Sequence, residues 1–271
     1  MFEIPPDHPR AESLRIREKL IEGFEKGLVA KAGLIAHGRG EAFDYLIGEK
    51  TTEPAMEAAR AAAAAILLAK HPVISVNGNV AALVPKEIVE LSEVTGAKIE
   101  VNLFYRTRER EEAIKNVLKE AGAKEILGVG AAASATIPEL SSWRRKVDPR
   151  GILVADVVLV PLEDGDRTEA LRKMGKTVIT IDLNPLSRTA QWANITIVDN
   201  VIRAVPNITE QAKKLKNFSE EKLKEILKSF DNRKNLRKMI EIIKNRLIEL
   251  AEKGVYILEA AQLYEEMRKI E

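Results

Sequence analysis

The sequence contains no cysteine, only three histidines, and no hydrophobic run long enough to cross a membrane. Without cysteine there are no disulfides, thiol nucleophiles or thiolate metal sites; this fits a reducing cytoplasm, and we expect a cytoplasmic protein. The longest apolar stretch, residues 55–69, is too short for a membrane span and contains Glu57 and Arg60. The first residues lack a basic region followed by an apolar one, so we expect no signal peptide.

Motifs of several common enzyme classes are also absent from the sequence. No GxxxxGK(S/T) string occurs, which excludes a Walker-type loop as an ATP site, and without GxSxG an α/β-hydrolase triad has no support. His8, His37 and His71 do not pair at ligand spacing, and neither HxxxH nor HxGH occurs, so we expect no protein-ligated zinc. Mg²⁺ held mainly by phosphates needs few protein ligands and stays compatible with the sequence.

Charged residues are abundant but balanced: they make up 31% of the chain, with a formal net charge of only +2. A surface rich in Lys, Arg and Glu, combined with no Cys and few Gln, is typical of thermophilic proteins. A protein dedicated to nucleic acid normally carries a clear basic excess. We therefore expect small-molecule partners and no nucleic acid.

From His71 onward, apolar segments alternate with amphipathic ones. Uninterrupted β-branched runs separated by amphipathic helices indicate parallel strands that are buried on both faces. The pattern therefore predicts an α/β fold with a Rossmann-like, doubly wound and mostly parallel sheet. The expected strands cover residues 73–76, 99–103, 125–129, 157–160, 177–181 and 195–198, and the expected helices between them cover residues 86–95, 107–121 and 167–174.

Helices are also expected before this core. The first covers residues 9–26, with an apolar stripe through Leu14, Ile21 and Phe24. Residues 36–40, Ala-His-Gly-Arg-Gly, are expected to be irregular because glycine interrupts them twice.

Further helices are expected on either side of the core. One covers residues 53–70, where the alanine run 61–65 allows close packing. After Pro206 the chain is rich in Lys and Glu and is predicted to be helical, with Asp231 capping the last helix and Gly254 ending it. We expect one domain over residues 1–271, made of an N-terminal helical region (1–70), a Rossmann-like core (71–205) and C-terminal helices (206–271).

Polar side chains stand at the carboxyl ends of the expected strands, where open parallel sheets bind ligands. Carboxylates and amides there suit hydrogen bonds to a base and ribose, and a loop arginine suits a phosphate, which predicts a nucleotide site. Turn chemistry alone also favours Asn, Asp and Gly at such positions, so each residue singly is also explained by its turn. The residues are Asn77, Gly78 and Asn79, then Asn102, Gly128 and Gly130, then Asp182, Leu183 and Asn184, and finally Asp199 and Asn200, with Ser187 and Arg188 between the last two strands.

Residues 128–133, Gly-Val-Gly-Ala-Ala-Ala, match the pattern GxGxx(G/A). Glycines at these positions let backbone N–H groups approach a phosphate. A nicotinamide or flavin site also needs an acidic residue at a strand end about twenty positions on. Asp148 lies in an expected loop and Asp156 opens a strand, so neither fits. A dinucleotide site and a generic phosphate-binding loop both stay open.

Arginines accumulate around the expected site. Arg39 lies between two glycines, so its guanidinium stands on backbone that can approach a ligand closely. Arg17 lies on the apolar face of the first expected helix, where it either snorkels to water or reaches into a site. Several arginines near a polyanion stabilise charge that develops on phosphoryl oxygens. The group comprises Arg10, Arg15, Arg17, Arg39, Arg106 and Arg188.

Four long segments carry a family resemblance that spans essentially the whole chain. They are IPPDHPRAESLRIREKL (4–20), GLIAHGRGEAFDYLIGE (33–49), VNGNVAALVP (76–85) and DLNPLSRTAQWANITIVDN (182–200). On these segments the chain resembles the archaeal phosphopantothenate synthetases, also called 4-phosphopantoate–β-alanine ligases.

The resemblance implies a homodimeric, ATP-dependent ligase of coenzyme A biosynthesis, with ATP as a substrate accompanied by Mg²⁺. Such an enzyme joins 4-phosphopantoate to β-alanine and releases AMP and diphosphate. The pantoate carboxylate attacks the α-phosphorus of ATP, and the β-alanine amine then displaces AMP from the acyl adenylate. The nucleotide contacts implied by the resemblance are Arg17, Arg39, Asp182, Leu183, Asn184, Ser187, Arg188, Asp199 and Asn200.

Two hypotheses about the reacting groups follow. We expect Arg39 to bridge the ATP phosphates and, with Asn79, to act in catalysis. The residues expected to hold 4-phosphopantoate are Asn77, Gly78, Asn79, Gly128 and Gly130. Two functions from other classes remain as alternatives: an NAD(P)-dependent oxidoreductase that uses residues 128–133, and a non-catalytic nucleotide-binding scaffold.

Overall fold

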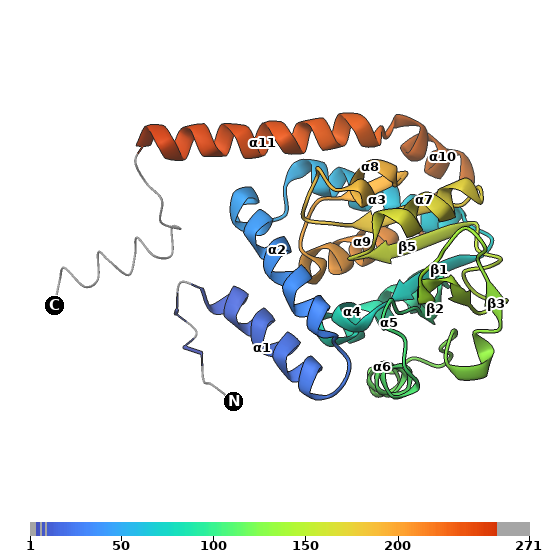
Figure 1. The fold of residues 1–271 in the computed structure, drawn as a ribbon. Coiled ribbons are helices and arrows are strands. Elements are labelled where there is room, and N and C mark those ends of the chain that lie inside the picture. The colour runs from blue at the N-terminus through green and yellow to red at the C-terminus, as the bar shows by residue number, and fades with distance from the viewer. Residues whose placement is uncertain (1–3, 6, 9, 254–271) are drawn as a thin grey trace.

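The structure is a computed structural model that describes residues 4–5, 7–8 and 10–253. Its centre is a five-stranded parallel sheet with the order β2-β1-β5-β6-β7 (Figure 1). This confirms the predicted α/β fold with a parallel sheet. The strands are β1 (Pro72–Val76), β2 (Lys98–Val101), β5 (Val157–Pro161), β6 (Thr177–Ile181) and β7 (Ile195–Ile197).

The sheet is buried on both faces, as its uninterrupted apolar strands predict. In β5, Val157 and Leu159 belong to one hydrophobic cluster, whereas Val158 and Val160 belong to the cluster on the opposite face. Successive side chains of a strand point to opposite faces, so a strand that is apolar throughout needs cover on both sides.

Helices from distant parts of the chain cover the two faces. On one face α3 (Glu53–Leu68), α5 (Pro85–Thr95) and α9 (Val201–Leu215) pack together, and the alanine run 61–65 of α3 is fully buried there. On the other face lie α7 (Gly165–Lys173) and the segment 135–155. The shorter elements are α4 (Gly78–Leu83), α6 (Arg108–Glu120), α8 (Arg188–Trp192), α10 (Glu220–Ser229), the hairpin of β3 (Ala135–Thr136) and β4 (Lys146–Val147), and 3₁₀ turns at Gly130–Ala132 and Trp143–Arg145.

The N-terminal region folds as two helices, α1 (Ala11–Glu25) and α2 (Lys31–Ile47), which lie side by side beyond one edge of the sheet (Figure 1). The expectation that residues 36–40 are irregular is wrong, because they form the middle of α2. The start expected at residue 9 lies outside the described residues.

The buried face of α1 also differs from the expected stripe. Ile16 and Leu20 are buried there, whereas Ile21 and Phe24 are exposed.

The expected strand over residues 125–129 is also wrong. Leu127 forms only an isolated bridge beside β2, with its N–H donating to Ile99 and its carbonyl accepting from Val101. Gly128 follows with a φ of +76°, which turns the chain away before a second pair can form.

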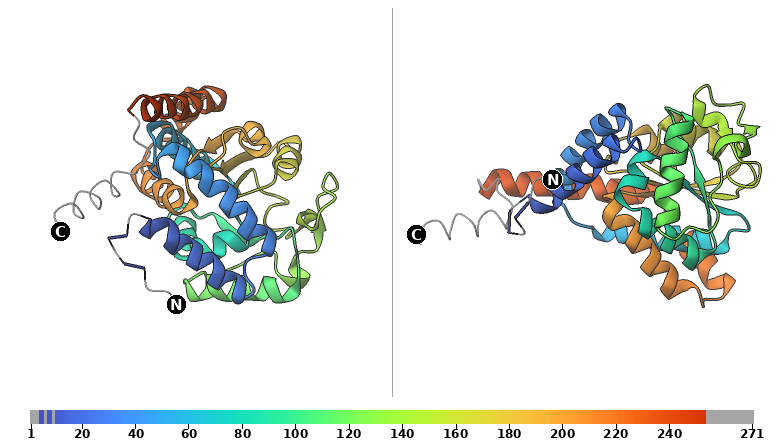
Figure 2. Two further views of the ribbon diagram at one scale, coloured as in Figure 1. Left: turned by 60° about the vertical axis from the view of Figure 1, so that its left-hand side comes forward. Right: turned by 90° about the horizontal axis from the view of Figure 1, so that it is seen from below.

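The C-terminal region begins with α9, so the expected boundary at 205/206 falls inside a helix that packs on the sheet. The last described helix is α11 (Asn232–Lys253), and Asp231 caps it as predicted, with Oδ1 accepting from the N–H of Lys234 at 3.0 Å. The expected end at Gly254 lies outside the described residues. The first half of α11 packs through Leu236 and Met239, and the second half extends away from the sheet (Figure 2).

Among the described residues, no helix combines the length and the apolarity that crossing a membrane requires.

Candidate functional site

Helix α2 runs along the carboxyl edge of the sheet, where parallel sheets bind ligands. Near its start, the carbonyl of Gly33 accepts a hydrogen bond from Asn79, which follows β1, at 2.9 Å. In its middle, Gly40 lies against Leu183, which follows β6; a Cβ at Gly40 would be 3.5 Å from the Leu183 side chain. Near its end, Asp44 accepts from Asn200, which follows β7, at 2.9 Å. Helix α2 therefore contacts residues that follow β1, on one side of the central strand β5, and residues that follow β6 and β7, on the other side.

The segment after β6 is organised around the carboxylate of Asp182. Oδ1 accepts from the N–H of Asn184 at 2.9 Å, and Oδ2 accepts from the hydroxyl of Ser187. Ser187 in turn caps α8 by accepting from the N–H of Ala190 at 2.9 Å. Burial raises the pKa of Asp182, and the hydrogen bonds from Ser187 and Asn184 and the charge of Arg39 oppose that rise. The segment thus presents a rigid, acceptor-rich turn beside a helix N-terminus, which suits a ribose and a phosphate.

Two of the predicted cations stand close to this turn. Arg39 is exposed on α2 and interacts electrostatically with Asp182. Arg188, the first residue of α8, has a side chain that is 69% exposed and, within the described part of the chain, paired only with the partly exposed Glu169 at 3.1 Å. Both guanidinium groups are therefore available to an anionic ligand at the end of β6.

The predicted residues after β7 lie deeper in the protein. Asp199 is fully buried and accepts from Thr51 at 2.6 Å and from Arg203 at 2.8 Å, while Asn200 donates to Asp44 and caps α9. Burial raises the pKa of Asp199, and Arg203 and Thr51 oppose it. Asp199 and Asn200 therefore stabilise the carboxyl edge next to the segment that follows β6. All the polar contacts described for them are with other protein groups.

Arg17 lies on α1 and contacts α2. It forms a two-point ion pair with Glu41 of α2, and Arg10 donates to Tyr45 on the next turn of that helix. Arg15 is exposed and stands apart from this pair.

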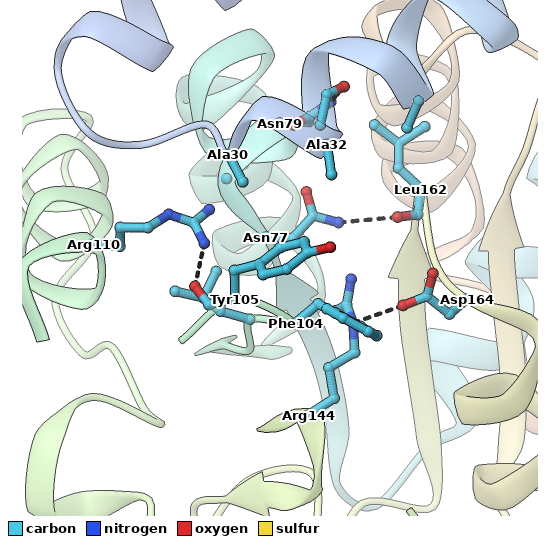
Figure 3. A pocket seen from close by; sticks show the side chains of 14 residues that line it. Ala30, Ala32, Asn77, Asn79, Phe104, Tyr105, Arg110, Arg144, Leu162 and Asp164 are labelled. Carbon is cyan, nitrogen blue, oxygen red and sulfur yellow. Dashed lines mark hydrogen bonds and ion pairs between the residues drawn. The ribbon is translucent and has the colours of Figure 1, made fainter. Parts of the chain in front are cut away.

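A cavity of about 230 Å³ lies at the ends of β1, β2 and β5 (Figure 3). Asn77 caps α4 through its side-chain oxygen and donates to the carbonyls of Pro161 and Leu162, so it ties the ends of β1 and β5 together. The expected phosphopantoate residues Asn77, Gly78 and Asn79 all line this cavity. Its other lining residues are Ala30, Ala32, Gly33, Ala36, Leu103, Phe104, Tyr105, Arg110, Arg144, Leu162 and Asp164.

Two arginines line the cavity, and only Arg110 has no carboxylate partner among the described residues. Arg110 of α6 donates to the backbone carbonyls of Tyr105 and Leu28, and no carboxylate among the described residues pairs with it. Burial and the charge of Arg144 lower the pKa of Arg110. Arg144, on the opposite side in Figure 3, is paired with Glu163 and Asp164 at 2.9 Å and 3.1 Å. A half-buried guanidinium without a carboxylate partner is a binding group for an anion.

The glycine loop at 128–130 lies outside this cavity. The N–H of Gly130 donates to Glu111 at 2.8 Å, and a Cβ at Gly128 would lie 2.5 Å from the carbonyl oxygen of Val101. Arg106 is held beside the loop by Glu111 and by backbone carbonyls. Close packing explains Gly128, and a φ of +58° explains Gly130, where a Cβ would meet no atom within 4 Å. The dinucleotide alternative lacks the helix it needs, because a three-residue 3₁₀ turn follows instead.

Several residues of this edge were not predicted from the sequence. Glu41 and Asp44 had a detectable signal, because they share one face of α2 with His37 at helical spacing. Arg110, Arg144 and Asp164 had none, since long sequence distances separate them and only the fold brings them to one cavity.

Comparison with known proteins identifies the family. The profile of the phosphopantothenate/pantothenate synthetases matches residues 54–246. A 4-phosphopantoate–β-alanine ligase of Thermococcus kodakarensis is 59% identical over 94% of this chain and 98% of its own length. Proteins of the same name from Methanosarcina mazei and Methanospirillum hungatei are 54% and 48% identical, over 94% and 91% of this chain and 100% and 99% of their own lengths. The chain belongs to the phosphopantothenate/pantothenate synthetase family.

Proposed function

We propose that this protein is a cytoplasmic, ATP-dependent ligase of coenzyme A biosynthesis that joins 4-phosphopantoate to β-alanine. It releases AMP and diphosphate through an acyl-adenylate intermediate. Relatives that carry the name of this activity cover nearly the whole chain. The structural observation that carries the proposal is the placement of an acceptor-rich turn and a cationic cavity side by side on one sheet edge.

The carboxyl edge of the sheet has two parts, the segment 182–188 after β6 and the cavity at the ends of β1, β2 and β5. Each part binds a different substrate. ATP occupies the turn after β6, where Asp182, Leu183 and Asn184 face the nucleoside and Ser187 and Arg188 face the phosphates. Arg17 and Arg39 reach the phosphates from the N-terminal helices. Asp199 and Asn200 support this half from below, because their buried side chains hold α2 and α9 in place.

The acid substrate occupies the cavity. Asn77, Gly78 and Asn79 line its wall, and Arg110 provides a cation for the phosphate or carboxylate of 4-phosphopantoate. Gly128 and Gly130 remain a prediction as substrate contacts, and their internal hydrogen bonds and packing give them little part in this proposal.

The chemistry requires that two anions meet. Arginines around the edge reduce the repulsion between the pantoate carboxylate and the triphosphate, and they stabilise the departing diphosphate. Arg39, exposed beside Asp182, is placed to bridge the phosphates, and Asn79 orients the acid. The edge must also exclude water, because an acyl adenylate hydrolyses.

We propose that Mg²⁺ accompanies ATP and is held mainly by its phosphates. In the part of the chain that the structure describes, no group of three or more acidic or histidine side chains could hold a metal ion alone. Asp182 supplies a hard oxygen ligand near the phosphates, and one or two carboxylates are the usual protein share of a nucleotide-bound Mg²⁺.

A homodimer is the proposed assembly. Several large apolar side chains are exposed on helices: Ile35 on α2 is 69% exposed, and Leu247 and Ile248 on α11 are 46% and 47% exposed. Such side chains are typical of a surface that a second copy covers. Light scattering on the purified protein tests this assembly directly.

The function is tested by incubating purified protein with ATP, Mg²⁺, 4-phosphopantoate and β-alanine and identifying the nucleotide product. AMP that requires both organic substrates supports the proposal. ADP would show an acyl-phosphate route instead. Binding of NAD(P)H in the absence of any ligation would overturn the assignment altogether.

A further inference from the structure

The turn between β5 and α7, residues 162–165, lies between the two halves of the edge. Asp164 lines the cavity, and the next residue, Gly165, packs against α8. A Cβ at Gly165 would lie 2.5 Å from the Cβ of Arg188. In the sheet, β5 separates β1, which leads to Asn77, from β6, which leads to Asp182. Acid bound on one side and nucleotide bound on the other therefore meet beside this turn.

Asp164 is the only carboxylate among the described residues that line the cavity. Its side chain is 46% exposed, and Oδ2 accepts from Nε of Arg144 at 3.1 Å. No hydrogen bond from a described residue reaches Oδ1. Figure 3 shows Asp164 and Arg144 together on one side of the cavity, with Arg110 on the other. One oxygen is thus held by Arg144, and the other has no hydrogen-bond partner among the described residues that line the cavity.

The charges around Asp164 favour proton uptake. Burial raises the pKa of Asp164, and the neighbouring carboxylates of Glu163 and Asp166 add to that rise, whereas the charge of Arg144 opposes it. A carboxylate with a raised pKa accepts a proton from a bound ammonium group more readily than an ordinary aspartate does.

The other buried carboxylates near the edge are already occupied. Glu163 has a side chain that is 1% exposed and pairs with both Arg144 and the fully buried Arg167. Glu100 is completely buried and accepts from two backbone N–H groups, and a Cβ at Gly151 would lie 2.0 Å from its carboxylate. Neither can reach a substrate.

Building on the ligase function proposed above, we propose that Asp164 is a catalytic residue that binds the ammonium group of β-alanine and accepts its proton. The amine nitrogen, now carrying a lone pair, attacks the acyl carbon of the adenylate and forms the C–N bond. The bond from that carbon to the phosphate oxygen breaks, and AMP leaves with the electron pair. The nitrogen then loses a second proton to water, which leaves the amide, and Asp164 returns its own proton to water through its exposed side.

The test separates the two half-reactions in the full-length protein. Formation of the adenylate is measured as ATP–diphosphate exchange that depends on 4-phosphopantoate, and ligation as AMP release that depends on β-alanine. Asp164→Asn is expected to lower β-alanine-dependent turnover about 100-fold or more, the usual range for general-base loss. Exchange is expected to stay within a few-fold of wild type. Asp166→Asn, at an exposed position in the first turn of α7, is the matched control and is expected to keep both activities.

A second acceptor sharpens the result. Hydroxylamine is uncharged at neutral pH and needs no base before it attacks, so Asp164→Asn should form the hydroxamate at nearly the wild-type rate. Asp164→Ala, which cannot hydrogen-bond, is expected to behave in the same way. Loss of exchange and ligation to the same extent would overturn the proposal and assign Asp164 to ATP or its Mg²⁺. If the wild-type protein itself showed neither exchange nor ligation, the proposed function would be overturned. That outcome does not depend on any variant.

Discussion

Arg17 on α1 and Glu41 on α2 form a two-point ion pair, with Nε 2.9 Å from Oε2 and Nη2 2.7 Å from Oε1. Burial raises the pKa of Glu41, but hydrogen bonds from Arg17 and Tyr45 outweigh that effect and hold the pKa below its ordinary value. The pair joins the two N-terminal helices and fixes the direction of the Arg17 side chain against α2.

Arg17→Ala is expected to lower kcat/KM for ATP much more than it lowers stability. The side chain is 40% exposed, so the ion pair contributes at most about 1 kcal/mol to folding. A lost hydrogen bond to a phosphate costs about 2 kcal/mol, roughly a 30-fold change. Glu41→Gln keeps the cation and removes its anchor, so its effect on steady-state kinetics should be smaller. If Glu41→Gln lowered kcat/KM more than Arg17→Ala did, Arg17 would act only through its ion pair with Glu41.

Arg39→Ala is expected to reduce turnover by orders of magnitude without lowering the melting temperature. Arg39 is exposed and its interaction with Asp182 is electrostatic, so the fold loses little when the side chain is removed. Arg39→Lys, which keeps the charge but not the planar fork, should recover part of the activity. Near-normal turnover of Arg39→Ala would show that Arg39 is not part of the ATP site.

Arg110→Met is expected to raise the KM for 4-phosphopantoate about 10- to 100-fold, the equivalent of roughly 1.5–3 kcal/mol for a charged hydrogen bond. The KM for ATP should stay unchanged, because Arg110 lines the cavity and not the turn after β6. Arg108→Met, on an exposed position of the same helix, is the control. Equal changes in both variants would mean a general loss of positive potential in place of a specific contact.

Glu100 gives stability a pH dependence near neutrality. Burial raises its pKa to about 7. A raised carboxylate pKa means that the folded state binds more protons, so this contribution is complete below the ordinary pKa and is lost as pH rises through 7. In urea unfolding, wild type should lose up to roughly 3 kcal/mol between pH 4.5 and pH 8 from this group. Glu100→Gln should show a flatter profile, and parallel profiles would place the titration elsewhere.

Two glycine substitutions are expected to change stability in opposite directions. Gly38 lies inside α2, and a Cβ there would meet no atom within 4 Å. Gly38→Ala should therefore raise the free energy of unfolding by about 0.5–1 kcal/mol. Gly151→Ala should lower it by about 1–3 kcal/mol, because its Cβ would overlap the buried carboxylate of Glu100. Urea unfolding of both variants checks the pair; a destabilised Gly38→Ala would reveal a hidden contact on that face.

The sheet was predictable from sequence because its strands are apolar throughout, and that pattern depends on local residues alone. The helical conformation of residues 36–40 in α2 was not predictable, because tertiary contacts outweigh the low intrinsic helix propensity of glycine. Gly33 is needed in that helix, because a Cβ there would lie 2.4 Å from the side-chain oxygen of Asn79. The strand expected at 125–129 failed for a related reason, since only one residue finds a partner on β2.

The site was predictable where ligand-binding residues follow strands directly. Asp182 and Ser187 stand at the edge as expected, but Asp199 is fully buried, which a strand-end position cannot reveal. The cavity carboxylate, Asp164, follows β5, whose end showed no polar signal because Pro161 and Leu162 come first. Its neighbour Arg144 comes from a 3₁₀ turn that no sequence period marks.

The position of α2 has a consequence for any shortened form of this protein. The family profile begins at residue 54, after both N-terminal helices. A fragment cut there would keep the five strands but would lose Ile16, Leu20, Leu28 and Val29 from the main hydrophobic core, together with the cations of α1 and α2. It would also leave the carboxyl edge of the sheet uncovered where α2 now contacts Asn79, Leu183 and Asn200. Under the proposed function, an acyl adenylate at such an edge would be exposed to water and hydrolysed before an amine arrives.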